Sequence, residues 1–364
     1  MRPTWAEIDL NSLRENFRYV KSAVGAGMDI LSVVKADAYG HGAVPISRAL
    51  VNEGTYMLGV ATVNEALELR GAGITKPIVM LGGVVEEEAE AVVGNDLIPA
   101  VFSVSVARAL NSAARKREKS LGFHLKVDTG MNRLGVYVDE IADFLDGISG
   151  LDNIRMEGLF SHFASAELDD ATHTMKQLEQ FTKIAAIVKK VGFRPRYLHL
   201  ANSAAIQRFP ETHLNMVRPG IMLYGSSQLP GHALRPVMKL KSRVVQIKKA
   251  PKGSAVSYGG TFLTQRPTLL AVLPIGYADG YMRTLSNNAS VSVRGQRAPV
   301  VGAVCMDLTI IDVTDVPGVE VGEEVVLFGD AVVTVDDVST WAGTISYELL
   351  SNTGRRVSRK YVCE

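Results

Sequence analysis

The chain has 364 residues, which is enough for two domains and a large buried core. Its 39 Lys and Arg residues balance its 38 Asp and Glu residues, which argues against binding to nucleic acid or to an anionic membrane. Cys305 and Cys363 form no disulfide framework or zinc motif, and no signal-peptide pattern or membrane-length apolar run occurs, so we expect a soluble cytoplasmic protein without a metal site.

Strand-like and helix-like segments alternate along the first two thirds of the chain. Eight strands are predicted, at 30–34, 56–60, 77–81, 98–102, 123–127, 156–160, 197–200 and 214–217. Helices are predicted after the first seven, at 43–53, 64–71, 86–93, 105–117, 139–145, 171–190 and from Ser203. Strict alternation predicts a parallel sheet, and eight units over roughly 200 residues fit a (β/α)₈ barrel better than an open sheet.

The pattern changes after about Gly231. Short β-rich runs separated by Gly, Pro and Asp follow, at 241–249, 269–273, 290–293, 300–304, 309–313 and 325–327. Such runs are typical of an all-β domain. We therefore expect a second domain, with its boundary between Gly231 and Pro236.

A lysine, Lys35, ends the first predicted strand, and the segment then breaks into Tyr39-Gly40-His41-Gly42. A strand leading into a loop is the expectation here. Burying a lysine is costly unless its charge is neutralised or used. Desolvation lowers the pKa of such an amine and leaves a nucleophile that can form a Schiff base. The alternative is a lysine that reaches the surface at the end of the strand.

Other predicted strands also end in polar residues. In a barrel, catalytic groups lie where strands end and loops begin, on one face. The candidates are Lys126 with the run 128–135, His162, His199 with Asn202 and Ser203, and Arg218 with Gly220 and Ile221. Backbone N–H groups near Ser203 and Gly220 could bind a phosphate. The alternative is helix capping by Asn202 or Ser203 and a turn at Gly220.

The run Val33-Val34-Lys35-Ala36-Asp37-Ala38-Tyr39-Gly40-His41-Gly42 strongly resembles the cofactor-lysine signature of alanine racemases. The resemblance extends along the chain through the runs 128–135, 161–164, 201–203, 217–221, 256–261, 276–280 and 305–307. Asp37 stands where Asn is common in the family, and the run 351–354 is less typical.

The resemblance implies the fold and the chemistry. We expect a (β/α)₈ barrel that binds pyridoxal 5′-phosphate over residues 11–231. A mainly-β domain would cover residues 232–364 and include a strand from residues 1–10. In a homodimer this domain would contribute to the partner's active site. The enzyme would interconvert L-alanine and D-alanine by two-base proton transfer and supply D-alanine for peptidoglycan.

The resemblance also implies residue roles on the two faces of the substrate. Lys35 would hold the cofactor as a Schiff base and act as an acid/base on one face. Tyr258 would act on the opposite face, across the dimer interface, and His162 would contact it. Arg218 would donate a hydrogen bond to the cofactor ring nitrogen, and His199 would support Arg218. Since arginine only donates, the ring nitrogen would stay unprotonated.

The remaining implied roles concern binding. The cofactor would be held further by Tyr39, Arg133, Asn202, Ser203, Gly220, Ile221 and Tyr347. Arg133 would also face the substrate carboxylate, to which Met306 would offer its backbone N–H, and Tyr277 would narrow the entrance. Asp307 would support these binding residues without itself contacting the cofactor or the substrate. Lys126 matches a lysine that is carbamylated in some family members; the alternative is a direct salt bridge to a nearby acid.

Several alternatives remain open at this point. The nearest is a related racemase of broader specificity, acting for example on serine. Less favoured are a decarboxylase of the same fold group, a non-catalytic cofactor-binding barrel and a cofactor-free Schiff-base aldolase. The β-rich region that carries Tyr258 argues against a barrel acting alone.

Overall fold

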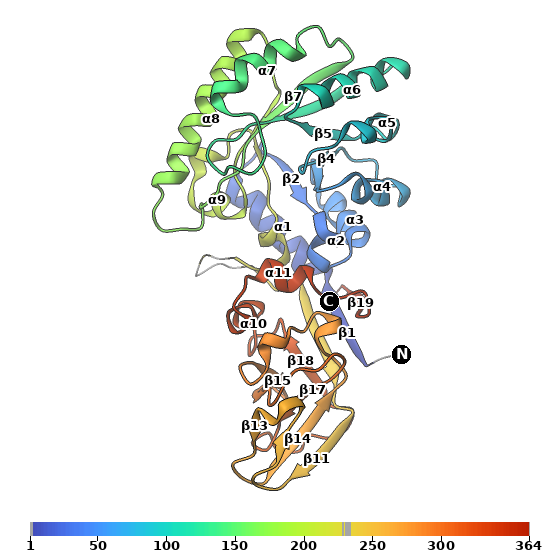
Figure 1. The fold of residues 1–364 in the computed structure, drawn as a ribbon, viewed down its shortest axis with the longest axis vertical. Helices are drawn as coiled ribbons and strands as arrows, with labels where there is room; N and C mark the ends of the chain where they lie inside the picture. Colours follow the sequence, from blue (N-terminus) through green and yellow to red (C-terminus); the bar gives the residue numbers. More distant parts are fainter. Residues whose placement is uncertain (1–2, 228, 230–233, 364) are drawn as a thin grey trace.

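The computed structural model describes residues 3–227, 229 and 234–363. The chain forms two units stacked along its longest axis, a barrel above and a β-rich unit below (Figure 1). No helix in these described ranges is both long and apolar enough to cross a membrane.

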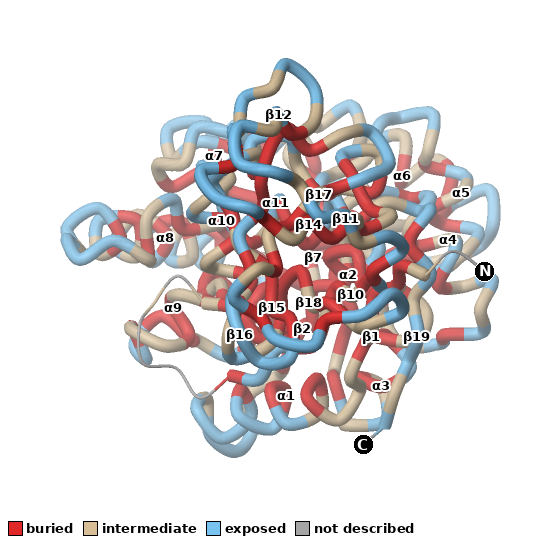
Figure 2. The backbone as a smooth tube through the Cα atoms, turned by 90° about the horizontal axis from the view of Figure 1, so that it is seen from below, coloured by how far each residue is buried: buried red, intermediate tan, exposed pale blue. Residues whose placement is uncertain are grey.

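The upper unit is a closed barrel of eight parallel strands, which confirms the predicted fold class. Its strands are β2 (Asp29–Val33), β3 (Met57–Val60), β4 (Ile78–Met80), β5 (Ile98–Val101), β6 (Leu121–Lys126), β7 (Ile154–Phe160), β8 (Tyr197–His199) and β9 (Met216–Val217). The barrel closes where Asp29 and Ile30 of β2 pair with Met216 and Val217 of β9. Most strand residues are buried and appear red in Figure 2. They are buried because helices cover the outer face of the barrel and side chains fill its interior.

Helices surround the barrel on its outer side. They are α1 (Leu10–Val24), α3 (Ala43–Glu53), α4 (Val63–Gly71), α5 (Ala89–Gly94), α6 (Val104–Lys116), α7 (Ile141–Ile148), α8 (Thr172–Val191) and α9 (Ser203–Arg208). Each longer helix packs one apolar stripe inward; α6, for example, buries Ala107, Leu110, Ala113 and Ala114. The sequence pattern predicted every one of these helices except α1.

The segment after β2 differs from the expected loop. It is a compact turn, α2 (Lys35–Gly40), which begins at the lysine itself. Within it, all residues from Ala36 to Tyr39 have φ near +53°, so this turn is left-handed. L-residues adopt that conformation rarely and usually one at a time.

The lower unit contains one large sheet and two smaller ones. The strand order of the large sheet is β16 (Gln296–Pro299), β15 (Ser290–Val293), β18 (Glu324–Phe328), β10 (Met238–Arg243), β1 (Thr4–Asp9) and β19 (Ser358–Val362). The smaller sheets are β11 (Gln246–Ala250), β14 (Thr268–Leu273) and β17 (Thr309–Asp312), and the pair β12 (Ala255–Val256) and β13 (Phe262–Leu263). The predicted β-rich run at 300–304 forms only one isolated bridge, from Val300 to Ile311.

Two helices interrupt the expected all-β pattern of this unit. They are α10 (Val335–Ala342) and α11 (Ser346–Ser351). A reciprocal capping box between Thr334 and Asp337 starts α10, and Gly343 in the left-handed region ends it. The expectation of an all-β domain was therefore wrong, and the unit is mainly β. The residues that start and end α10 are visible in the sequence.

The first strand of the chain lies in the lower unit. Strand β1 pairs antiparallel with β10 and parallel with β19, so the two ends of the chain meet in one sheet. The predicted boundary between residues 231 and 232 lies outside the described residues. Helix α1 leads from β1 into the barrel.

Candidate active site

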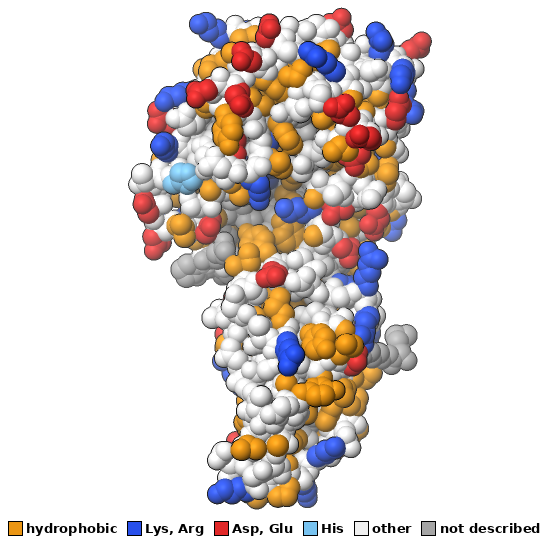
Figure 3. Space-filling view, viewed as in Figure 1, with side chains coloured by type: hydrophobic (Ala, Val, Ile, Leu, Met, Phe, Trp, Pro, Cys, Tyr) orange, Lys and Arg blue, Asp and Glu red, His pale blue; other side chains and the backbone are white. Residues whose placement is uncertain are grey.

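A cavity of about 370 Å³ opens at the C-terminal ends of the barrel strands, next to the hollow between the two units (Figure 3). Its lining includes Lys35, Tyr39, Lys126, Arg133, Leu134, Phe160, His162, Asn202, Ser203, Arg218, Gly220, Ile221 and Tyr347. Most of the residues that the strand-end argument singled out therefore share one cavity. This is the face of a barrel on which catalytic groups gather.

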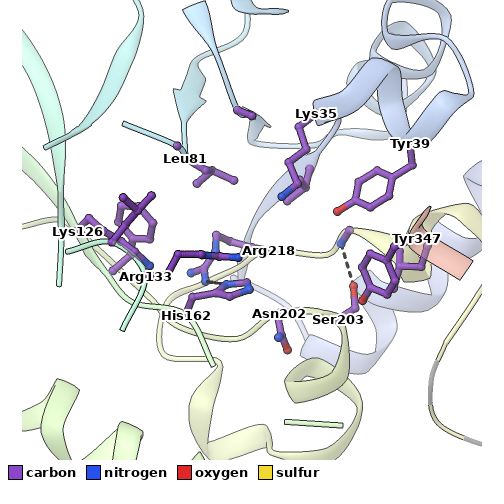
Figure 4. Close-up of a pocket in the computed structure, with 17 residues that line it drawn as sticks. Lys35, Tyr39, Leu81, Lys126, Arg133, His162, Asn202, Ser203, Arg218 and Tyr347 are labelled. Carbon is purple, nitrogen blue, oxygen red and sulfur yellow. Dashed lines mark hydrogen bonds between the residues drawn. The ribbon is translucent and has the colours of Figure 1, made fainter. Parts of the chain in front are cut away.

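Lys35 follows β2 directly and points its amine into the cavity (Figure 4). Desolvation lowers the pKa of this amine, and the cations Arg133 and Arg218 lower it further. The carboxylate of Glu65 acts in the opposite direction. A lysine of this kind carries the neutral, nucleophilic form more readily than a lysine in water.

Arg218 lies 4% exposed at the floor of the cavity. Its Nη1 donates to His199 Nδ1 at 3.1 Å and to the His199 carbonyl at 2.8 Å. Its Nη2 faces the carbonyls of Ser161 and Leu200 and lies 3.2 Å from His162 Nδ1. Burial lowers the pKa of Arg218 to about 9, but this value is still high enough for the guanidinium to be protonated at neutral pH. Among the described residues Nε has no partner, so this N–H is left to donate into the cavity.

The contacts of Arg218 fix the protons of three histidines. Since a guanidinium cannot accept, His162 and His199 must accept at Nδ1 and carry their protons on Nε2. The Nε2 proton of His199 is then donated to Nδ1 of His124, 2.9 Å away. Burial lowers the pKa of His124 to about 3, so this histidine is neutral at neutral pH. Because its Nδ1 accepts, its proton lies on Nε2, which has no partner among the described residues. His124 was not predicted as a site residue, because it lies inside β6 and not at the end of a strand.

Arg133 is positioned by a loop that Asp128 organises. The carboxylate of Asp128 accepts the backbone N–H groups of Gly130, Met131 and Arg133 at 2.8–3.0 Å. Desolvation raises the pKa of Asp128, but these N–H donors outweigh it and lower the pKa overall. The charged carboxylate therefore holds the loop in place at neutral pH.

Lys126 is buried beside two other cations. Its Nζ lies 4.7 Å from the centroid of the Phe160 ring. Desolvation lowers the pKa of Lys126 far below its ordinary value, and Arg218 and Arg133 add to this. The salt bridge considered as an alternative does not form with any described acidic residue within 4.0 Å. Burial and the neighbouring cations therefore favour the neutral form of this amine.

Hydroxyl and backbone groups gather at the other end of the cavity. The Ser203 hydroxyl accepts from the backbone N–H of Gly220 at 2.9 Å. The rings of Tyr39 and Tyr347 lie 6.0 Å apart, and burial raises the pKa of both phenols, so they remain donors. Asn202 caps α9 by accepting from Ala205, as the capping alternative predicted, and it also lines the cavity.

Five predicted site residues do not line this cavity: His199, which hydrogen-bonds to Arg218, and four residues of the lower unit. Tyr258, Tyr277, Met306 and Asp307 belong to the lower unit, and we call them the β-unit patch. The first three side chains are exposed by 73%, 43% and 52%, respectively. The backbone N–H groups of Tyr277 and Ala278 donate to the carbonyls of Cys305 and Met306, respectively. These hydrogen bonds join the segment that carries Tyr277 to the one that carries Met306 and Asp307. One chain alone therefore does not bring Tyr258 to Lys35.

A side-chain clamp supports the β-unit patch. Arg356 pairs with Asp307 at 2.6 Å and with the buried Asp279 at 3.3 Å. The Ser257 hydroxyl, next to Tyr258, donates to the Ala303 carbonyl at 2.7 Å. The patch is thus held as a unit although its side chains face outward.

Known proteins resemble this chain over its full length. The family models for the alanine racemase N-terminal and C-terminal domains match residues 8–228 and 237–361. The alanine racemase of Desulfovibrio desulfuricans is 47% identical over 365 residues, covering 99% of this chain and 98% of that protein.

Solved structures agree with this likeness. An alanine racemase of Clostridium difficile 630 superimposes with a TM-score of 0.94 at 37% identity, over 100% of this chain and 96% of that one. An alanine racemase of Bartonella henselae with covalently bound pyridoxal phosphate superimposes with a TM-score of 0.92 at 32% identity, over 100% of both chains.

Proposed function

Because this chain belongs to the alanine racemase family and is a pyridoxal 5′-phosphate-dependent isomerase, we propose that it interconverts L-alanine and D-alanine. The observation that carries the proposal is the gathering of Lys35, Arg218 and Arg133 around one cavity at the C-terminal face of the barrel. Like its relative from Desulfovibrio desulfuricans, it would act on alanine.

The residues present fit the cofactor. The amine of Lys35 enters one side of the cavity, and the Ser203 hydroxyl and the backbone at Gly220 form the other. A Cβ on Gly220 would lie 2.7 Å from the Tyr39 hydroxyl, so only glycine leaves the space that a phosphate needs there. When bound, pyridoxal 5′-phosphate supplies an aldehyde carbon that captures amino groups and a conjugated ring that acidifies the Cα–H bond of an amino acid.

Lys35 does two things in this proposal. Its amine is the attachment point of the cofactor, and once displaced by substrate it takes or gives a proton at Cα on one face. The lowered pKa of this amine suits both tasks, because the neutral form is the nucleophile and the base.

Arg218 would donate its Nε–H, which has no partner among the described residues, to the ring nitrogen of a bound cofactor. As a guanidinium it can donate there but cannot accept, so the nitrogen stays unprotonated and the ring withdraws fewer electrons. A cofactor held in this way would favour racemisation over side reactions such as transamination.

The second face requires a partner subunit. Tyr258 is highly exposed and lies in the outward-facing patch, which supports its insertion into the cavity of a second copy. We propose a homodimer in which the partner subunit's Tyr258 meets Nε2–H of His162. That N–H would stabilise a phenolate, and the nearby cation Arg218 would add to the effect.

Substrate recognition would be shared between the subunits. Arg133 suits the planar carboxylate of the substrate, and Met306 of the partner subunit would add a backbone N–H. Tyr277 and Tyr347 would limit the pocket to small side chains. A pocket of this kind distinguishes alanine from serine only modestly, so a broader racemase remains the second candidate.

Further assignments rest on the same proposal. Residues 11–231 would form the cofactor-binding barrel, and residues 232–364 with the strand in 1–10 the β-rich domain. The neutral amine of Lys126 is the form that adds carbon dioxide, and the resulting carbamate would pair with Arg133. The enzyme would work in the cytoplasm and supply D-alanine for peptidoglycan.

The test uses the purified, cofactor-loaded enzyme and a chiral assay against a panel of L-amino acids. We expect racemisation of alanine to dominate and reductive trapping to attach the cofactor to Lys35. Lys35→Ala should lose the visible absorption band, whereas Lys116→Ala, at an exposed lysine on α6, should keep it. A colourless wild-type enzyme that resists trapping overturns the proposal.

A further inference from the structure

The left-handed turn that follows Lys35 is the most strained segment near the cavity. Ala36, Asp37, Ala38 and Tyr39 all have φ of +53°, although none is glycine. A run of such residues persists only where the surrounding structure holds it in place, and such strain tends to lie at functional sites. The position of the Lys35 amine depends on this turn, because Lys35 is its first residue.

One carboxylate holds the start of the turn. Oε1 of Glu65 accepts the backbone N–H of Ala36 at 2.7 Å, which is the first N–H after the lysine. Oε2 of the same side chain accepts from Ala61 at 2.7 Å, just after β3. Glu65 therefore joins the C-terminal ends of β2 and β3 at the edge of the cavity.

Glu65 also has an ordinary structural task. It completes a capping box with Thr62: the Thr62 hydroxyl accepts from the Glu65 N–H, and the carboxylate accepts from the Thr62 N–H, both at 3.3 Å. A capping box needs no contact with Ala36. The bond to Ala36 is thus an additional contact aimed at the turn.

We propose that Glu65 is a positioning residue for Lys35: it holds the left-handed turn so that the amine keeps its aim at the substrate carbon. This inference rests on the proposed function and adds a residue to its site. The negative charge of Glu65 also raises the pKa of the Lys35 amine, against the effect of the cations Arg133 and Arg218. The other titratable groups around the cavity are Lys126, His162, Tyr39 and Tyr347.

The proposal predicts an effect on one face of the substrate only. Lys35 moves the proton on one face and the partner's Tyr258 on the other. Misaiming the lysine should slow proton removal from one enantiomer of alanine and raise its deuterium isotope effect. The isotope effect for the other enantiomer should stay the same or fall, because the partner's Tyr258 removes that proton.

Matched variants separate aiming from helix capping. Glu65→Gln keeps the shape but removes the charge and one acceptor, and Glu65→Ala removes every contact. Thr62→Ala removes the other half of the capping box and leaves the bond to Ala36. Glu68→Gln removes an exposed acid from the same helix, α4, and controls for the loss of charge.

Each variant is measured as cofactor-loaded dimer with Cα-deuterated L- and D-alanine, and the pH dependence of Lys35 acylation is measured in the cofactor-free full chain. We expect both Glu65 variants to lower kcat roughly 10- to 100-fold, with the enlarged isotope effect for one enantiomer. Lys35 should become reactive at lower pH in Glu65→Gln, because an opposing negative charge is gone. Thr62→Ala and Glu68→Gln should match the wild type in these readouts.

Two results overturn the inference. One is Glu65→Gln behaving as Thr62→Ala does; the other is an isotope effect that rises equally for both enantiomers. If Glu65→Ala does not fold, Glu65→Gln decides alone, and Glu65→Asp should restore activity in part. A wild-type enzyme without cofactor on Lys35 defeats the proposed function, whereas insensitive Glu65 variants of a coloured, active enzyme defeat only this inference.

Discussion

Arg218 and His199 are joined at two points, since Nη1 of the arginine lies within hydrogen-bonding distance of both Nδ1 and the carbonyl oxygen of the histidine. The arginine can only donate, so its charge sets the direction of every proton in the chain that runs on to His124. The tautomers at the floor of the cavity therefore follow from one group that is charged at neutral pH and can only donate.

Removing the end of this chain should cost stability. In His124→Phe the Nε2–H of His199 loses its acceptor inside the barrel, while the new ring packs near Phe160 and Tyr197. We expect the free energy of unfolding to fall by about 1–3 kcal/mol, measured by urea denaturation. The exposed His173→Ala should stay within about 0.5 kcal/mol of the wild type. Equal losses in the two variants would contradict the proton assignment.

Buried histidines make the fold sensitive to acid. Burial lowers the pKa of His41 to about 4 and that of His124 to about 3, from the ordinary 6.5. Below about pH 6.5 the unfolded chain binds more protons than the folded one, so stability falls as the pH falls through this window. Each such histidine contributes a slope of up to about 1.4 kcal/mol per pH unit.

Urea denaturation at about pH 7.5 and about pH 5 measures this slope. We expect a lower midpoint at the acid pH, and a smaller difference between the two midpoints in His41→Asn. His173→Ala, at an exposed position, should keep the full difference. A midpoint that rises on acidification would mean that other groups dominate.

The Lys35 turn also depends on a glycine packed against the last strand. A Cβ on Gly42 would lie 1.9 Å from the Tyr361 hydroxyl, and φ there is +97°. Gly42→Ala should therefore lower the free energy of unfolding by about 1–3 kcal/mol. Tyr361→Phe removes the colliding oxygen, so the double variant should lose less than the sum of the single variants. Gly25→Ala, with φ of +82° and nothing within 4 Å, isolates the backbone cost.

The proposed second acid/base is tested by Tyr258→Phe. Loss of one positioned proton-transfer group should slow turnover by roughly 10²–10⁴-fold, measured in the chiral assay. Tyr19→Phe, at an exposed position on α1, should retain full activity. Full activity in Tyr258→Phe would assign the second face to another residue.

Mixed dimers test whether sites are shared. Lys35→Ala and Tyr258→Phe are each expected to be nearly inactive alone. After subunit exchange, a mixed dimer has one site with both native residues, so part of the activity should return. Mass-tagged subunits would verify the exchange, and exchange without recovered activity would place both residues of a site in one chain.

The sequence was most informative where pattern and function agree. Alternating apolar runs predicted all eight barrel strands, and the strand-end rule placed Lys35, His162 and Arg218 on one face of the barrel. Both inferences depend on local periodicity, which a single sequence displays. The roles of these residues, by contrast, came from the resemblance and remain predictions.

Long-range and strained features were not predictable in this way. His124 contacts His199 across 75 residues, and nothing local in β6 distinguishes it from a core residue. The left-handed turn at Ala36 contradicts local propensity, because no glycine marks it, and its support from Glu65 comes from another helix. Tyr258 lies outside the cavity of its own chain, and no local pattern shows where its side chain points.

The pairing of β1 with β10 and β19 sets an order on biosynthesis. The ribosome makes β1 before the barrel, but its two neighbours in the sheet, β10 and β19, are made only after the whole barrel. Strand β1 therefore has unpaired edges while the barrel forms. A chain that stopped after the barrel would leave that edge open to other chains, so the large sheet can be completed only after the barrel strands have been made.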